Sequence, residues 1–157
     1  MINEFTADIM EALRRYHSLL IGERTAEQIK IQVGAAMKDI DNPPDDFPVN
    51  GRDLVTGIPK QIMVSYQEIA EALDKSIFKI EEAILKALAQ TPPELAADIY
   101  RRGLYITGGG ALLRGLDKRI GNKIKLPVHI ADDPLKSVVR GTGIALKNYS
   151  RYPFVMR

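Results

Sequence analysis

The sequence contains no cysteine at any of its 157 positions. Disulfide bonds and thiolate metal sites are therefore excluded, and this composition suits a reducing cytoplasm, where we expect the protein to be located. Histidine occurs only at His17 and His129. Two histidines without cysteine are a poor basis for a metal centre, so we expect no metal site.

Long apolar runs and a strong charge bias are also missing. No apolar stretch is long enough to span a bilayer, and we expect the chain to have no membrane segment of its own. The formal net charge is only +2, and apart from Arg14-Arg15 and Arg101-Arg102 the basic residues are scattered. Nucleic acid is therefore not an expected partner. The length and the 45% hydrophobic content indicate one globular domain, or two small lobes of one.

A glycine run stands at the centre of the sequence. Residues 104–106 have the composition of a strand, Gly108, Gly109 and Gly110 follow, and an apolar helical pattern then continues to Ile120. A strand, a glycine turn and a helix start let a ligand approach outward-pointing backbone N–H groups. A tight turn without a ligand explains the glycines equally well, because neither G-x-G-x-x-G nor the Lys-Ser/Thr of a P-loop is present.

The amino-terminal third predicts two helices. Thr6 is expected to cap the first, whose apolar side would consist of Ile9, Met10, Leu13, Tyr16 and Leu20. Thr25 to Gln28 has the pattern of a capping box and predicts a second helix to about residue 36. On that helix Glu27 and Lys30 are three residues apart, which taken alone predicts a surface ion pair.

The middle of the chain predicts a hairpin followed by a long helix. An exposed acidic loop at 39–46 precedes short strands at 47–49 and 54–64, with Asn50-Gly51 between them as the turn. Ser65 to Glu68 is a second capping box. It opens the longest helical pattern, whose apolar stripe we expect to be buried: Ile69, Leu73, Ile77, Ile80, Ile84 and Leu88.

The remaining elements complete an α/β half. We expect a short helix at 94–101, a strand at 126–131 beside the strand at 104–106, and a final helix from Asp133. Gly121 is expected as the C′ residue of the helix after the glycine run. Residues before 65 would form a smaller α+β lobe, and a cleft between two lobes is a usual place for a nucleotide.

Several of these runs resemble the MreB family of bacterial actin homologues. The resemblance is carried by Pro-Pro-Glu-Leu-Ala-Ala-Asp-Ile at 92–99 and Thr-Gly-Gly-Gly-Ala-Leu-Leu-Arg-Gly-Leu-Asp at 107–117. It extends to Gly-Glu-Arg-Thr at 22–25, Asp-Pro-Leu at 133–135 and Gly-Thr-Gly at 141–143. The runs occur in family order along nearly the whole chain and match the carboxy-terminal portion of the family.

The resemblance implies an α/β fold, the second domain of the actin-like ATPase or ribonuclease H-like fold. Residues 1–64 would be its outer lobe, 65–147 its inner lobe, and 148–157 a carboxy-terminal tail. In the family the glycine run passes beneath the sugar and α-phosphate of ATP, which assigns Gly108, Gly109 and Gly110 to backbone contacts. Leu112 and Leu113 would border the base. The same analogy gives Glu27 and Lys30 contacts with the base and ribose.

Two parts of the family pattern are absent. Neither the Asp-x-Gly-Thr core of the first phosphate loop nor the Asp-x-Gly-Gly-Gly-Thr of the second occurs in the sequence. The carboxylates that hold Mg²⁺ and the amino-terminal membrane-binding segment are not found either. We therefore expect a fragment that is not an enzyme as given, with no catalytic residues of its own.

Three classes of function are compatible with this pattern. The first is a cytoskeletal subunit that binds ATP, polymerises with itself, and maintains rod shape with a RodZ-type membrane-anchored protein and the cell-wall synthesis machinery. Such a protein would be cytoplasmic and associated with the membrane through its filaments. The second is a sugar kinase or chaperone ATPase of the same superfamily, against which the Pro-Pro-Glu-Leu and Gly-Glu-Arg-Thr runs argue. The third is a stand-alone interaction module.

Overall fold

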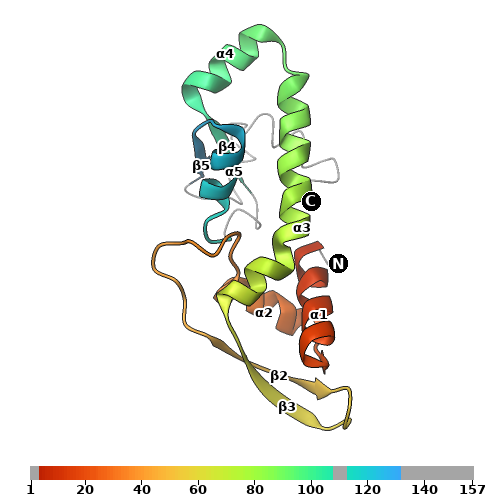
Figure 1. Cartoon of the computed structure of the whole chain (residues 1–157). Helices are drawn as coiled ribbons and strands as arrows, with labels where there is room; N and C mark the ends of the chain where they lie inside the picture. Colours follow the sequence, from red (N-terminus) through yellow and green to blue (C-terminus); the bar gives the residue numbers. More distant parts are fainter. Residues whose placement is uncertain (1–3, 108–112, 132–157) are drawn as a thin grey trace. The chain divides into compact units, whose positions relative to one another are not determined.

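The computed structural model describes residues 4–107 and 113–131, and the chain divides into two compact units, residues 1–76 and 77–157 (Figure 1). The long helix α3 (Tyr66–Ala89) contributes residues to both units. The division therefore falls inside α3, whereas the predicted lobes divide after residue 64, and that assignment of lobes remains a prediction.

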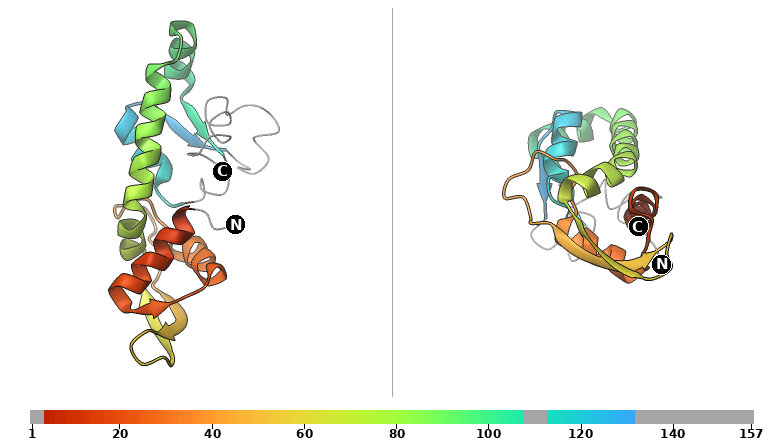
Figure 2. Two further views of the ribbon diagram at one scale, coloured as in Figure 1. Left: turned by 90° about the vertical axis from the view of Figure 1, so that its right-hand side faces the viewer. Right: turned by 60° about the horizontal axis from the view of Figure 1, so that its bottom comes forward.

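The first unit is a three-stranded antiparallel sheet with two helices. Its elements are α1 (Glu4–His17), β1 (Leu19–Leu20), α2 (Glu23–Val33), β2 (Phe47–Asp53) and β3 (Pro59–Val64). The strand order is β1-β2-β3, and both views of Figure 2 show β2 and β3 running side by side. Helix α1 packs on α2 and β1, and α2 packs on β2. The core of this unit includes Ile9, Leu13, Leu19, Ile29, Val49 and Val64.

The predicted start of the first two helices is wrong. Thr6 lies inside α1 and is buried, so it is not the residue at which the helix begins. Gly22 is the N-cap of α2, because its carbonyl oxygen already accepts the Ala26 N–H at 3.0 Å, and Thr25 is within the helix. The predicted stripe of the first helix also ends early: Tyr16 is exposed, and Leu20 belongs to β1 and is exposed as well.

The capping prediction at Ser65 is confirmed. Its Oγ accepts the Glu68 N–H at 3.3 Å at the start of α3. The Glu68 carboxylate contacts His17 Nε2 at the end of α1. This contact ties the first turn of α3 to α1 within the first unit.

The hairpin is present, but its turn is not at Asn50-Gly51. Both residues lie within β2, where Gly51 pairs with Lys60 of β3, and the chain reverses at 54–58. A Cβ atom on Gly51 would lie 2.6 Å from the Leu20 carbonyl oxygen. Glycine at this position therefore serves the close approach of β1 to β2, and the Asn-Gly pair is not a turn signal here.

The described part of the second unit contains a pair of parallel strands and three helical segments. Besides the later part of α3, its described elements are α4 (Pro93–Arg102), β4 (Leu104–Ile106), α5 (Leu116–Ile124) and β5 (Val128–Ile130). Strand β4 pairs with β5 in parallel, which confirms them as neighbours. Leu104 and Ile106 are buried, whereas the Tyr105 and His129 rings stack on the exposed side with centroids 4.9 Å apart. Of these two strands, only one face of β4 is fully buried.

Helix α5 differs at both ends from the predicted helix. It begins at Leu116, and Gly121 lies inside it. Lys125 ends the helix in the left-handed conformation with φ 63°, and its N–H bonds to the Gly121 carbonyl oxygen at 2.9 Å. The predicted final helix from Asp133 and the tail at 148–157 lie outside the described residues.

The apolar stripe of α3 is confirmed in large part. Ile69 and Leu73 are buried in the first unit and Ile77 and Ile84 in the second, while Ile80 and Leu88 are partly exposed. One charged side chain lies among these residues. Glu81 is 4% exposed, and Arg119 of α5 donates two hydrogen bonds to its carboxylate, from Nε to Oε2 at 3.2 Å and from Nη2 to Oε1 at 3.3 Å.

We predict that Gly51→Ser destabilises the first unit by about 1–3 kcal/mol, because the new Cβ would force β1 away from β2. Gly22→Ser is the matched control, since a Cβ there meets nothing within 4 Å and serine is a good N-cap residue. Urea unfolding followed by circular dichroism measures both. Equal urea midpoints for the two variants would show that β1 does not approach β2 closely at Gly51.

We predict that Arg119→Leu lowers the free energy of unfolding by about 3 kcal/mol, because it leaves the Glu81 carboxylate buried without its partner. The double variant Glu81→Leu/Arg119→Leu should recover much of that loss. A double-mutant cycle in urea gives the coupling directly. Additive single effects would show that the pair is not energetically coupled.

Candidate adenine-nucleotide site

The carboxyl ends of β4 and β5 meet at one edge of their sheet. The register pairs Leu104 with Val128 and Ile106 with Ile130, so both strands end at the same level. Beyond them the Ala131 N–H donates to the Ile106 carbonyl oxygen at 3.2 Å and continues the pairing by one bond. In open α/β sheets, ligands bind outside this edge. The chain leaving β4 there is the start of the predicted nucleotide motif.

Two residues that flank the glycine run are fixed in the second unit. Thr107 directly follows β4 and is 1% exposed, and Leu113 is 5% exposed. The Leu113 carbonyl oxygen accepts the Leu116 N–H at 3.3 Å, and Gly115 between them has φ 78°, which favours glycine. Of the predicted site, Gly108, Gly109, Gly110 and Leu112 lie outside the described residues, and the contact of Leu113 with the base stays a prediction.

Glu27 and Lys30 form the predicted ion pair on α2. Lys30 Nζ lies 2.9 Å from Glu27 Oε2, and the lysine side chain is only 10% exposed while the glutamate side chain is 44% exposed. The neighbouring Ala26 and Ile29 are buried and hold this part of α2 in the first unit. The geometry confirms the pairing, and the roles of the two residues toward base and ribose stay predictions.

The charged pair between α3 and α5, Glu81 with Arg119, was not predicted from the sequence. Glu81 follows Ile77 by four residues and precedes Ile84 by three, so the helical period already placed it on the apolar stripe. Arg119 likewise stands between Leu116 and Ile120 of α5. A charged residue on each apolar face was the available signal that the two helices meet through an ion pair.

The described part of the chain contains neither a cluster of metal-ligating side chains nor a helix that could span a membrane. Among residues 4–107 and 113–131, no three or more histidine, aspartate or glutamate side chains gather as the ligands of a metal ion would. Within the same ranges no helix combines the length and apolar character that crossing a bilayer requires.

Comparison with known proteins gives matches along nearly the whole chain. The cell shape-determining protein Mbl of Bacillus subtilis is 44% identical over 151 residues, which are 96% of this chain and 45% of that protein. The cell shape-determining protein MreB of Escherichia coli strain K12 is 43% identical over 148 residues, 92% of this chain and 41% of that protein. The chain thus spans less than half the length of these relatives.

Solved structures agree with the sequence relatives. A crystal structure of MreB5 of Spiroplasma citri bound to ADP matches with a TM-score of 0.83 at 38% identity, covering 95% of this chain and 45% of that one. A non-polymerising mutant of MamK bound to AMPPNP matches with a TM-score of 0.65 at 21% identity, which shows the fold alone. These neighbours confirm the predicted actin-like α/β fold, while the domain that the chain corresponds to stays a prediction.

A family model matches residues 2–153, and its description is MreB/Mbl protein. This match covers nearly every residue of the sequence, including both units of the structure. The resemblance seen in the sequence is thereby confirmed: the chain belongs to the MreB/Mbl protein family.

Proposed function

We propose that this chain supplies one wall of an adenine-nucleotide site in an MreB-type cytoskeletal protein. The observation that supports this proposal most directly is the parallel pairing of β4 with β5. At the carboxyl end of β4 the buried Thr107 follows, and in the sequence the glycine run comes directly after it. Backbone N–H groups at such an edge suit the sugar and α-phosphate of a nucleotide. In this proposal Gly108, Gly109 and Gly110 contact the nucleotide through their main chain.

Related structures support the class of ligand. MreB5 of Spiroplasma citri has been crystallised with ADP and also with AMPPNP, the latter matching with a TM-score of 0.80 at 37% identity. Both ligands carry an adenine base, which makes ATP, with Mg²⁺ in a family-length protein, the natural proposal for this chain. The family match favours this proposal over a sugar kinase or a chaperone ATPase.

The proposed cellular role is the maintenance of rod shape through filaments that organise cell-wall synthesis. Curated relatives are cell shape-determining proteins, and a further neighbour in fold is a MamK filament. We extend self-association to this chain, together with a RodZ-type partner and the cell-wall synthesis machinery. The filaments would lie in the cytoplasm against the membrane.

We further propose that the residues present here do not hydrolyse ATP. The sequence has no Asp-x-Gly-Thr or Asp-x-Gly-Gly-Gly-Thr loop to hold the β- and γ-phosphates. Phosphoryl transfer depends almost wholly on such positioning and on charge stabilisation by metal ions and cationic groups. What remains is recognition of base and sugar.

We predict that the chain binds adenosine, ADP and ATP with similar dissociation constants of about 1 mM or weaker, and that Mg²⁺ changes none of them. The triphosphate adds no affinity, because no phosphate loop meets it. Isothermal titration calorimetry with and without Mg²⁺ measures this. A Mg²⁺-dependent preference for ATP would show that other residues replace the missing loops, and no binding of any of the three would remove the site.

We predict that Lys30→Met weakens adenosine binding about three- to tenfold, since it removes a charged donor assigned to the base and ribose. Arg101→Met is the matched control: Arg101 pairs with Asp98 at 3.2 Å on α4, with the same three-residue spacing. The titrations are repeated with both variants. Equal affinity of the Lys30 variant and the unaltered chain would exclude Lys30 from the site.

Sedimentation with ATP separates the proposed role from a stand-alone interaction module. A polymer-forming subunit pellets when it is tested at the length of its relatives, whereas an interaction module stays in the supernatant. A protein that stays in the supernatant would contradict the proposed filaments. The proposed nucleotide site would still be tested by the titrations described above.

A further inference from the structure

Asn50 and Gly51 form the one asparagine–glycine pair of the sequence. The chain has five asparagines, and only Asn50 is followed by glycine. Glycine has no side chain to hinder its own backbone nitrogen, so that nitrogen attacks the preceding carboxamide more readily here than at any other asparagine of the chain. The pair is therefore the position most prone to deamidation.

Deamidation at this pair proceeds through a cyclic intermediate. The Gly51 backbone nitrogen attacks the carboxamide carbon of Asn50, and the new C–N bond closes a succinimide ring. The carboxamide C–N bond breaks, and its nitrogen leaves as ammonia with the proton of the Gly51 N–H. Water then opens the ring at either carbonyl carbon. One opening gives aspartate, and the other gives isoaspartate, in which the main chain runs through the former side-chain carbons.

Strand β2 holds the attacking nitrogen away from its target. Gly51 pairs with Lys60 across the β2–β3 ladder. The Asp53 N–H donates to the Ile58 carbonyl oxygen at 2.9 Å, and residues two apart on a strand face the same neighbour, so the Gly51 N–H is directed at β3 as well. Ring closure also needs a backbone at Asn50 that has left the antiparallel strand, whose ψ is about +135°.

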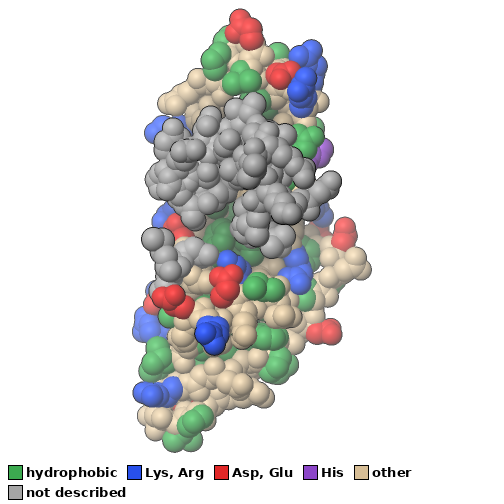
Figure 3. Space-filling model, turned by 180° about the vertical axis from the view of Figure 1, so that it is seen from behind, with side chains coloured by type: hydrophobic (Ala, Val, Ile, Leu, Met, Phe, Trp, Pro, Cys, Tyr) green, Lys and Arg blue, Asp and Glu red, His purple; other side chains and the backbone are tan. Residues whose placement is uncertain are grey.

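The Asn50 carboxamide is held on the neighbouring strand. Asn50 lies opposite Gln61, and Gln61 Nε2 donates to Asn50 Oδ1 at 2.9 Å. Both side chains are exposed. At the lower end of Figure 3, where the hairpin lies in Figure 1, much of the surface is tan, the colour of the backbone and of uncharged polar side chains. Water therefore reaches the hairpin, and the pair is protected by strand geometry and not by burial.

The edge strand β1 closes the other side of Gly51. A Cβ atom at this position would lie 2.6 Å from the Leu20 carbonyl oxygen and 2.9 Å from Leu19 Cγ. This packing requires glycine at position 51 and so retains the labile pair. It also leaves no space for a main chain that has been lengthened by a carbon atom.

We propose that Asn50 is a modification site that records opening of the β1–β2–β3 sheet. While the sheet is closed, the Gly51 nitrogen stays in the ladder and the pair does not react. When the sheet opens, ring closure proceeds and isoaspartate forms. The extra main-chain atom shifts the rest of β2 out of register. A copy that has opened and reacted therefore does not close again, and the mark is permanent.

Peptide mass spectrometry of the whole chain tests the protection. The chain is incubated at neutral pH in native buffer and in urea and then cleaved with trypsin, and fragment ions of the peptide 39–52 follow the conversion of Asn50. Conversion should be about a hundredfold slower in native buffer than in urea, because the reaction proceeds only from the open fraction.

Neighbouring residues of β3 provide a matched pair of variants. Val64 is fully buried, and Met63 is 55% exposed. Val64→Ala leaves a cavity under the hairpin and should accelerate conversion of Asn50 in native buffer about tenfold. Met63→Ala should not accelerate it. Circular dichroism of each variant shows that the fold is retained.

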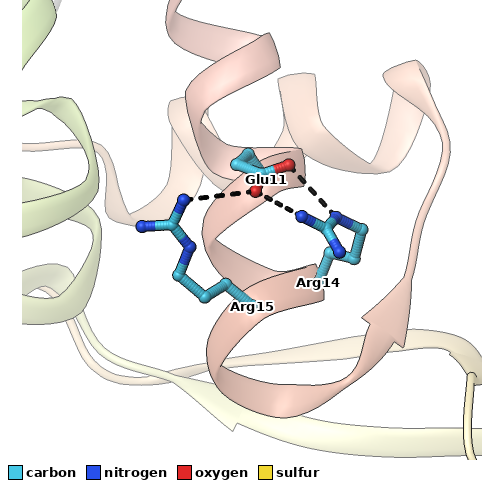
Figure 4. Close-up of polar contacts among 3 residues, drawn as sticks. All are labelled: Glu11, Arg14 and Arg15. Carbon is cyan, nitrogen blue, oxygen red and sulfur yellow. Dashed lines mark hydrogen bonds and ion pairs between the residues drawn. The ribbon is translucent and has the colours of Figure 1, made fainter.

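A second control lies on α1, outside the sheet. Glu11 pairs with Arg14 at 2.5 Å and with Arg15 at 3.6 Å (Figure 4). Exposed pairs of this kind contribute little to stability. Glu11→Gln removes both pairs and should leave the conversion rate of Asn50 unchanged.

The modified copies test the permanence of the mark. Anion exchange separates them by their added negative charge, and copies with isoaspartate at position 50 should unfold at a lower urea concentration than the unaltered chain. Asn50→Asp is the control, because it adds the same charge on an ordinary main chain. Its urea midpoint should equal that of the unaltered chain.

Three results would overturn the inference. Equal conversion rates in native buffer and in urea would show that the sheet does not protect the pair. Absence of conversion in urea would remove the site. An unchanged urea midpoint of the isoaspartate copies would show that the sheet closes around the modified residue. No nucleotide enters these measurements, so this inference and the proposed function fail independently.

Discussion

The parallel pairing of β4 with β5 is the constraint on which the candidate site depends. A parallel pair requires a crossover, and here the crossover contains the glycine run and α5. The pairing begins beside Gly103, whose φ is 81° and where a Cβ atom would lie 2.5 Å from the Pro127 carbonyl oxygen. Glycine at this position lets α4 end and β4 start against β5. At the other end of the strands, the same pairing brings Thr107 and Ala131 to one edge.

A second close approach organises the first unit. Gly51 lets the edge strand β1 lie against β2, and the chain before β1 then comes near the hairpin turn, where Ser18 accepts the Leu54 N–H. The hairpin is thereby tied to α1, and its turn closes on the Asp53 carboxylate. The side chains of Leu54, Val55 and Ile58 are therefore exposed, although the backbone N–H groups of these residues are hydrogen-bonded.

The sequence predicted what depends on periodicity and missed what depends on tertiary contacts. The stripe of α3, its start at Ser65 and the β4–β5 pair follow from local pattern and are found. Asn50-Gly51 has the local signal of a turn, but the approach of β1 uses that glycine inside a strand. Glu81 on the stripe of α3 and Arg119 among the apolar residues of α5 are separate signals in the sequence, and the packing of the two helices joins them as one pair. The roles of the glycine run came from resemblance and remain predictions.

The most direct test of a nucleotide wall at the carboxyl edge of β4 and β5 is a titration of the isotopically labelled chain with adenosine, in which the chemical shifts of the backbone amides are followed by NMR. We predict that the amides of Thr107 and Leu113, which flank the glycine run, shift together with one apparent affinity for adenosine. Amides of α4 and of the β2–β3 hairpin should not move. Shifts confined to those other elements, or none at Thr107 and Leu113 under saturating adenosine, would contradict a nucleotide wall at the carboxyl edge of β4 and β5.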